Sequence, residues 1–187
     1  MAHPKMKSCG IMACALTFAF AGGADASIAY FDLADTEYGS AGFSVIGSFQ
    51  TNAGGAEVTG FTIEQGVLQT YDNGGLPNWA SEAILGISVV LPSGEESIYL
   101  HLPFAETDGS GTYGPVDIQI DLSGGGYLVP EDGFITAYAI SSWDDGTDQS
   151  AGIWLQGDLN VNYLPGPASL AFLALAGMAS RRRRRDS

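Results

Sequence analysis

Alternating apolar and polar residues recur along the chain and predict β-strands. In the segment 116–122, apolar residues at even positions alternate with Asp117, Gln119 and Asp121, which is the two-residue period of a half-buried strand. The segment 153–163 alternates in the same way, and its pattern assigns Leu155 to the core side and Trp154 to the polar side. Both segments are therefore predicted to be strands with one face toward a core.

Turn sequences separate the predicted strands. Pro92-Ser93-Gly94-Glu95 lies between two apolar runs within residues 84–102 and predicts a β-hairpin. Turns are expected at the glycine-rich clusters 52–55, 72–75 and 123–126, and further strands at 28–33, 43–49, 57–63, 66–71 and 134–140. Residues 27–163 show no clear helical period. Roughly eight to ten short strands of this kind predict an all-β chain with a single β-sandwich or jelly-roll-like domain.

Residues 1–26 have the pattern of a secretory signal peptide. Lys5 and Lys7 precede an apolar run over 9–22, and Ala24-Asp25-Ala26 places small residues at the expected cleavage site after Ala26. The alternative is a lipoprotein signal with Cys14 as the lipidated residue, although few apolar residues precede it. In the signal-peptide interpretation both cysteines are removed, so the mature chain has no thiol or disulfide chemistry.

The end of the chain has three parts. Pro165-Gly166-Pro167 is followed by an uncharged apolar run, Ala168 to Ala179, and then by a basic cluster consisting of Arg181, Arg182, Arg183, Arg184 and Arg185. The 17 residues from Leu164 to Ser180 are at the short limit of a transmembrane helix, with the arginines expected on the cytoplasmic side. The alternative is a buried terminal helix with a basic nucleic-acid patch, which the strongly acidic remainder of the chain disfavours.

This tail resembles the PEP-CTERM sorting signal of exported bacterial proteins. The resemblance covers Leu164 to Ser187, with Gly166 in the place of the family's usual Glu. It implies an exosortase-type sorting enzyme in the membrane as a partner, besides signal peptidase and the export machinery. It also implies that the tail anchors the chain transiently and is removed, leaving the body released or attached at the cell surface. The expected organisation is a signal peptide at 1–26, a β-sandwich body at 27–163 and a sorting signal at 164–187.

The charge of the body restricts its partners. All seven basic residues lie outside 27–163, whereas only Asp25 and Asp186 of the 21 acidic residues do, which leaves 19 acids and no Lys or Arg in the body. Such a surface repels nucleic acid and acidic lipid, and it is stabilised by screening cations. No nucleic-acid partner is expected.

Residues with catalytic chemistry are few. His101, the body's one histidine, alternates with Leu100 and Leu102 and is predicted to be a solvent-facing strand residue. The body has no Cys, Lys or Arg to complete the usual nucleophilic constellations, and no P-loop, H-E-x-x-H or G-x-S-x-G motif. The sequence does not exclude a pair of carboxylates for glycoside hydrolysis, because the 19 acidic residues of the body could form many such pairs. We therefore predict no catalytic residues and no enzyme.

Two acidic loops and one tryptophan are candidate binding features. Asp144, Asp145 and Asp148 in one loop, and Asp108 in another, place carboxylates around glycines, as calcium ligands require; the alternative is ordinary acidic turns without a cofactor. Trp154 is a candidate for stacking on a sugar, and packing in a core is the alternative.

Two functional hypotheses follow. The first is an exported cell-surface or extracellular-matrix protein with a non-enzymatic structural or interaction role. The second is a lectin-like module that binds extracellular polysaccharide, either with calcium held by the acidic loops or without it.

Overall fold

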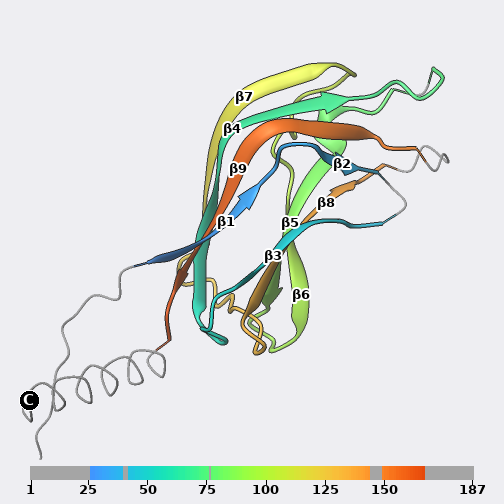
Figure 1. The fold of residues 1–187 in the computed structure, drawn as a ribbon. Helices are drawn as coiled ribbons and strands as arrows, with labels where there is room; N and C mark the ends of the chain where they lie inside the picture. The colour runs from blue at the N-terminus through green and yellow to red at the C-terminus, as the bar shows by residue number, and fades with distance from the viewer. Residues whose placement is uncertain (1–25, 40–41, 76, 144–148, 167–187) are drawn as a thin grey trace, which may run out of the picture.

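Two antiparallel sheets pack face to face as a β-sandwich (Figure 1). The computed structural model describes residues 26–39, 42–75, 77–143 and 149–166. The all-β prediction and the sandwich are thereby confirmed. Most of the predicted signal peptide, the apolar run after Pro167 and the five arginines lie outside the described residues. None of the described residues belongs to a helix with the length and apolar character needed to cross a membrane.

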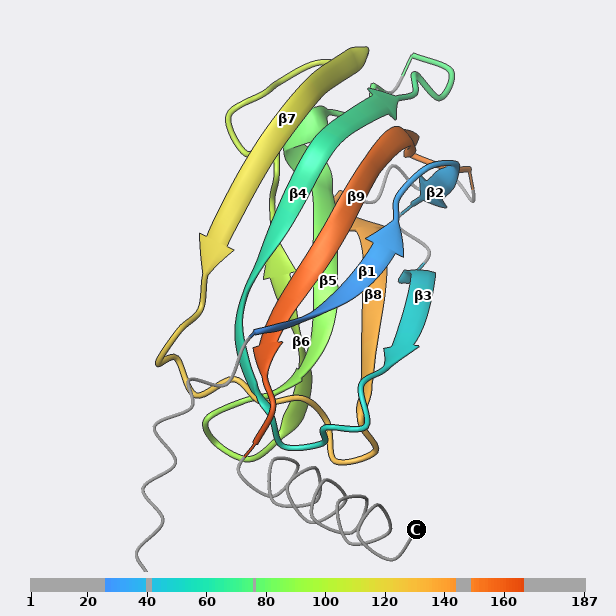
Figure 2. The same ribbon diagram turned by 60° about the vertical axis from the view of Figure 1, so that its left-hand side comes forward.

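The larger sheet has five strands in the order β1-β9-β4-β7, and β2 pairs with the first residues of β9 (Figure 2). Its strands are β1 (Ser27–Asp32), β2 (Thr36–Tyr38), β4 (Glu57–Thr70), β7 (Thr112–Asp121) and β9 (Gly152–Leu164). The four-stranded sheet has the order β3-β8-β5-β6. Its strands are β3 (Ser44–Gln50), β8 (Phe134–Ser141), β5 (Ala83–Val90) and β6 (Glu96–His101), and a 3₁₀ turn η1 (Ala80–Glu82) precedes β5.

The hairpin predicted around Pro92 joins β5 and β6. The N–H of Leu91 donates to the carbonyl of Glu95 at 2.8 Å, and the N–H of Gly94 donates to the carbonyl of Leu91 at 2.8 Å. Gly94 has a φ of 86°, a conformation that glycine adopts without steric cost. The local turn sequence was therefore sufficient to predict this connection.

The core lies between the sheets and is built from the inward side of the alternating patterns. Phe61, Leu159 and Val161 of the five-stranded sheet are buried, as are Leu85 and Ile135 of the four-stranded sheet. Each fully buried side chain of this size contributes about 1.5–3 kcal/mol relative to an exposed one, so the apolar alternation accounts for the pairing of the two layers.

A line of irregularities crosses the five-stranded sheet. Between the pairs Glu64↔Asp158 and Leu68↔Trp154, an extra residue in β4 is followed by an extra residue in β9, so both strands keep their overall register. In β7, one further residue intervenes near Gly114. Gln65 has a φ of 52°, in the left-handed region. We call this feature the bulge line; each extra residue reverses which side of the strand faces the core.

The bulge line corrects two sequence predictions. The segments 57–63 and 66–71 were predicted to be separate strands, but both belong to β4, because Gln65 and Gly66 form a bulge instead of a turn. The first residues of β9, on the N-terminal side of its bulge, have the reverse alternation to residues 158–163. Leu155 therefore faces outward at 41% exposure, and Trp154 is buried. The short strand β2 was not predicted.

Candidate functional site

The outer face of the five-stranded sheet carries polar side chains in register across its strands. Tyr30 in β1 pairs with Asn160 in β9, Asn160 pairs with Thr62 in β4, and Thr62 pairs with Gln119 in β7. These four residues lie at positions that alternate with buried core residues, so their side chains point away from the core. We call this set the polar row. It spans three strand spacings, about 14 Å.

Two neighbouring rows extend the face. On one side, Ile28 pairs with Asn162, which lies opposite Gly60, and Gly60 pairs with Asp121. On the other side, Asp32 pairs with Asp158, and Asp158 pairs with Glu64. The face therefore presents amides and a hydroxyl at its centre and carboxylates at its borders.

Tyr30 is the aromatic group of this face. The residue is 53% exposed, and its hydroxyl donates a hydrogen bond of 2.6 Å to Oδ1 of Asp158. This hydrogen bond, together with the nearby Asp158 and Asp32 carboxylates, raises the pKa of Tyr30 from 10.0 to about 12. The phenol is thus held protonated in a fixed direction, and the side chain remains accessible from solvent.

The two carboxylates of β7, Asp117 and Asp121, are partly occupied by hydrogen bonds from the protein. Asp117 accepts from the backbone N–H of Gln65 at 2.7 Å and from its side-chain amide at 3.1 and 3.2 Å. Asp121 accepts from the N–H of Ser123 at 2.9 Å, and hydrogen bonding with Ser123 lowers the pKa of Asp121. Within the described residues, no three His, Cys, Asp or Glu side chains are grouped to hold a metal ion.

Trp154 does not lie where the sequence placed it. The ring is fully buried, at 0% exposure, and its centroid is 6.0 Å from that of Phe104. An added Cβ at Gly66 would come within 3.2 Å of the indole, so the glycine makes room for the ring. A ring in this position packs the core and cannot stack on an external sugar.

His101 also faces the core side, contrary to the prediction. Its ring meets the buried Phe61 edge-on, with centroids 5.6 Å apart, whereas Leu100 and Leu102 are exposed. Partial burial lowers the pKa of His101 below its ordinary 6.5. The flanking leucines were misleading because both are themselves exposed, Leu100 on the outer face of the four-stranded sheet.

The candidate calcium residues are not brought together in the described part of the chain. Asp108 is exposed, and its Oδ1 accepts a hydrogen bond of 3.3 Å from the hydroxyl of Ser81. Asp144, Asp145 and Asp148 lie outside the described residues. Of the predicted sorting motif, Pro165 and Gly166 directly follow β9, and Pro167 lies outside the described residues.

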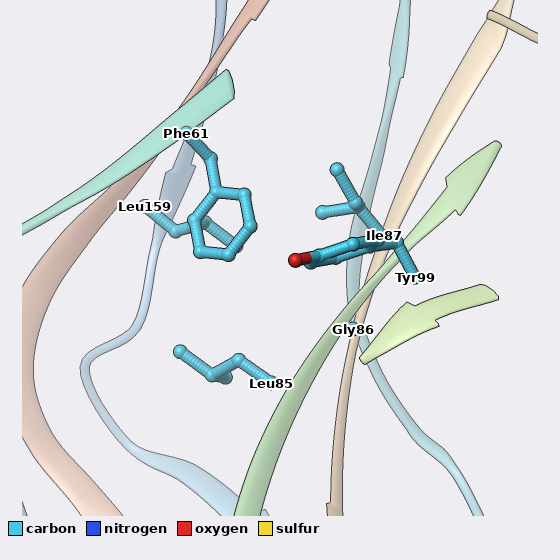
Figure 3. A pocket seen from close by; sticks show the side chains of 6 residues that line it. All are labelled: Phe61, Leu85, Gly86, Ile87, Tyr99 and Leu159. Atoms are coloured by element: carbon cyan, nitrogen blue, oxygen red, sulfur yellow. The ribbon is translucent and has the colours of Figure 1, made fainter. Parts of the chain in front are cut away.

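Two hollows are alternative candidate sites. Figure 3 shows one between the sheets, where Phe61 and Leu159 face Leu85, Ile87 and Tyr99; this space is too narrow for a water molecule. The other, of about 210 Å³, is open to solvent near Glu37 and Ser150, whose hydroxyl donates to the Glu37 carboxylate at 2.7 Å. The first hollow is apolar. The second is lined by polar residues and Tyr38, but Tyr38 is 2% exposed, so its ring offers no surface for stacking, unlike Tyr30 of the polar row.

Sequence reasoning missed the polar row. The alternation of Asp158, Asn160 and Asn162 was visible, but it indicated only a polar side of a strand. Nothing local shows that residues 27–32 pair with residues 158–163, and this pairing places Tyr30 beside Asn160.

Comparisons with known proteins give little further information. No protein-family model and no curated protein matches the chain. Weak likenesses were found to structures of infectious bursal disease virus, of the Gx strain (12% identity, TM-score 0.34) and the Gt strain (16% identity, TM-score 0.33). Each match covers 76% of this chain, which spans about a third of the viral chains, 33% and 34% respectively. Likenesses at this level carry no inference about the function of this chain.

Proposed function

We propose that this chain is an exported, non-enzymatic interaction protein of the cell surface or extracellular matrix, and that it binds neutral polysaccharide through the polar row. The observation that carries the proposal is the alignment of Tyr30, Asn160, Thr62 and Gln119 across four adjacent strands. A sheet holds these side chains in a fixed, flat array, so a ligand meets a preorganised surface.

The chemistry of the row suits a sugar chain. The exposed Tyr30 ring offers an apolar surface for the C–H groups of a sugar, and its hydroxyl is already engaged by Asp158. The amides of Asn160 and Gln119 both donate and accept hydrogen bonds, as sugar hydroxyls do. Each such hydrogen bond contributes about 0.5–1.5 kcal/mol, so several together give weak to moderate affinity.

Charge selects the class of polysaccharide. Asp32, Glu64 and Asp121 border the row, and the body has no Lys or Arg. An acidic glycan would meet only like charge, whereas a neutral one would not.

The test measures binding of the full chain to neutral glucan, mannan and galactan, with alginate as an acidic comparison. Tyr30→Ala is expected to weaken binding about tenfold, because it removes the ring, worth about 0.5–1.5 kcal/mol beyond its buried area. Tyr30→Phe keeps the ring and is expected to stay within about threefold of the native protein.

Phe134→Ala on the opposite sheet is the matched control, since it removes an exposed ring elsewhere and should leave binding unchanged. The binding proposal fails if none of the neutral glycans binds, or if Tyr30→Ala and Phe134→Ala have the same effect. Release of shortened sugars by the native protein would contradict the non-enzymatic role.

Sorting of the chain is proposed from the tail sequence alone. If the Pro165-Gly166-Pro167 tail is read as a PEP-CTERM signal, the mature protein should lack Arg181 to Arg185 by intact-mass measurement. Replacing the five arginines by serine should leave the uncleaved chain in the membrane fraction. The sorting proposal would be refuted if the serine variant were processed and released in the same way as the native protein.

A further inference from the structure

The outer face of the four-stranded sheet is nearly free of charge and carries an apolar patch beside a row of hydroxyl side chains. In that row, Ser48 and Thr136 share a hydrogen bond of 2.9 Å, and the Ser88 hydroxyl accepts from the N–H of Thr136 at 2.8 Å. Strands β3, β5 and β8 contain no charged residue, and Glu96 at the start of β6 is the one acid of these four strands. Val45 is 61% exposed and Leu100 47% exposed on this face. The strands of the five-stranded sheet, in contrast, carry seven acids: Asp32, Glu37, Glu57, Glu64, Asp117, Asp121 and Asp158.

One row of this face runs straight across its four strands. Val45 pairs with Tyr138, Tyr138 pairs with Gly86, and Gly86 pairs with Leu100. Phe43 extends the apolar surface at the β3 edge, where its ring meets that of Tyr138 at 5.6 Å. Gly86 is the one position of the row without a side chain, and it is buried because methyl groups of Ile98 and Leu100 fill the space beside it, 2.7 and 3.1 Å from where a Cβ would lie.

We propose that this face binds a second copy of the same chain. The body has 19 acids and no Lys or Arg, so most approaches of two copies bring carboxylates against carboxylates. Among the described residues, the face of β3, β8, β5 and β6 is a broad surface on which two copies can meet without this repulsion. An apolar patch that contains an aromatic residue and is depleted of charge, with polar residues around it, has the composition of an interface core.

The row is also complementary to itself. Consider a two-fold axis that lies in the interface between the two copies, parallel to the strands and above the line between β8 and β5. Rotation about this axis places Tyr138 of each copy over the partner's Gly86. The same rotation places Val45 over the partner's Leu100. Each ring then lies against the methyl groups of Ile98 and Leu100 that cover Gly86, and the aliphatic side chains of Val45 and Leu100 face each other at both borders. This is the isologous contact of a two-fold dimer.

The size of the face sets the strength of the contact. Four strands about 4.8 Å apart, each presenting about six residues of 3.4 Å rise, offer roughly 400 Å² per copy. Stable complexes bury about 800 Å² per partner, so the dimer is a weak and reversible one. Its detection needs concentrations from about 1 to about 500 µM.

The experiment measures the dimerisation constant of the full chain, in a mild detergent, by sedimentation velocity over this concentration range. Val45→Lys or Leu100→Glu is expected to weaken dimerisation at least about tenfold, because each variant places a charge against an aliphatic partner twice per dimer. The double variant with both substitutions is expected to recover dimerisation to within about threefold, since the introduced ammonium then faces the partner's introduced carboxylate. An equimolar mixture of the two single variants should form the heterodimer preferentially.

The controls are Ile28→Lys and Ile28→Glu, which introduce the same charges at a residue of the opposite sheet that is 54% exposed. Both should leave the dimerisation constant unchanged. The proposal is overturned if the native chain stays monomeric up to the highest concentration, or if the Ile28 and Val45 variants weaken association equally. It is also overturned if the double variant associates no better than either single variant, which would reject the two-fold pairing.

Discussion

At the scale of single residues, His101 shows how one ring couples the fold to pH. The imidazole lies on the inner side of an edge strand and meets Phe61, so protonation would place a charge beside an apolar core. Burial lowers its pKa below 6.5, whereas in the unfolded chain the ring titrates at its ordinary value. Between these two pKa values the unfolded state binds more protons than the folded state, so this residue's contribution to stability is present above about pH 6.5 and is lost as the pH falls.

We expect His101→Phe to remove this dependence while it keeps an aromatic ring against Phe61. Thermal melts at pH 7.5 and pH 5.5 measure it. The native protein should lose more stability, or gain less, on going to pH 5.5 than the variant does. The carboxylates titrate in both proteins and cancel in the comparison. Equal changes in the two proteins would show that burial of His101 has no effect on folding.

Two other residues illustrate the cost of a dense core. The hydroxyl of Tyr38 and the indole N–H of Trp154 are buried and make no hydrogen bond within the described residues. An unpaired buried polar group costs about 1–3 kcal/mol. The same burial raises the pKa of Tyr38 above its ordinary value. Burial of the apolar area of each ring therefore has to outweigh the cost of leaving its polar atom without a hydrogen bond.

At the scale of elements, the bulge line depends on close approach between strands. The inward position of Gly66 leaves room for the Trp154 ring, and an added Cβ would also come within 2.9 Å of Ile63. Gly157 and Gly114 approach Gly66 from the two neighbouring strands, where added Cβ atoms would lie 2.7 Å from the Gly66 Cα and 2.3 Å from its carbonyl oxygen. Small residues at one level of three strands allow the sheet to bend there.

We expect Gly66→Ala to destabilise the protein by about 1–3 kcal/mol, because the methyl group overpacks the space that Trp154 and Ile63 occupy. Chemical denaturation followed by tryptophan fluorescence measures this change. Gly47→Ala in β3 is the matched control, since the added Cβ there would make an ordinary contact of 3.4 Å with Phe31. Equal stability of the two variants would mean that the sheet adapts to the added methyl group at the bulge line.

The same elements show what the sequence could predict. The β5–β6 hairpin was predictable because a turn of four residues contains its own signal. The strand β7 was predictable from Val116 onward because its alternation is regular there. The inward position of Trp154 was not, since a bulge is decided by contacts with neighbouring strands. The polar row was out of reach for the same reason, because its members come from four strands that are distant in sequence.

At the scale of the whole molecule, charge is unevenly divided between the two layers. The acids of the strands lie almost entirely in the five-stranded sheet, without any Lys or Arg in the body to neutralise them. Neighbouring strands at 4.8 Å bring these carboxylates within the Debye length of about 8 Å at physiological salt, so their repulsion is only partly screened. The fold is therefore expected to depend on the ionic strength of its surroundings.

We expect the melting temperature of the full chain to rise with salt, and to rise equally in NaCl, MgCl₂ and CaCl₂ at matched ionic strength. Equal responses indicate screening alone. A higher melting temperature in CaCl₂ alone, which corresponds to a stabilisation of about 2.7 kcal/mol at a hundredfold excess over the dissociation constant, would instead assign a calcium site to the acidic loops. The absence of any salt response would contradict the repulsion that we describe.

The bulge line has a consequence for how the length of this protein can vary. Because β4, β9 and β7 each carry one extra residue at the same level, losing one alone would shift that strand against its neighbours and turn every later side chain to the wrong side. Loss of all three extra residues would restore a regular alternation of inward and outward side chains, and the residues of β4 would keep their partners in β9 and β7. Single-residue gaps in these three strands should therefore occur together in any alignment of related sequences, as compensating deletions far apart in the chain.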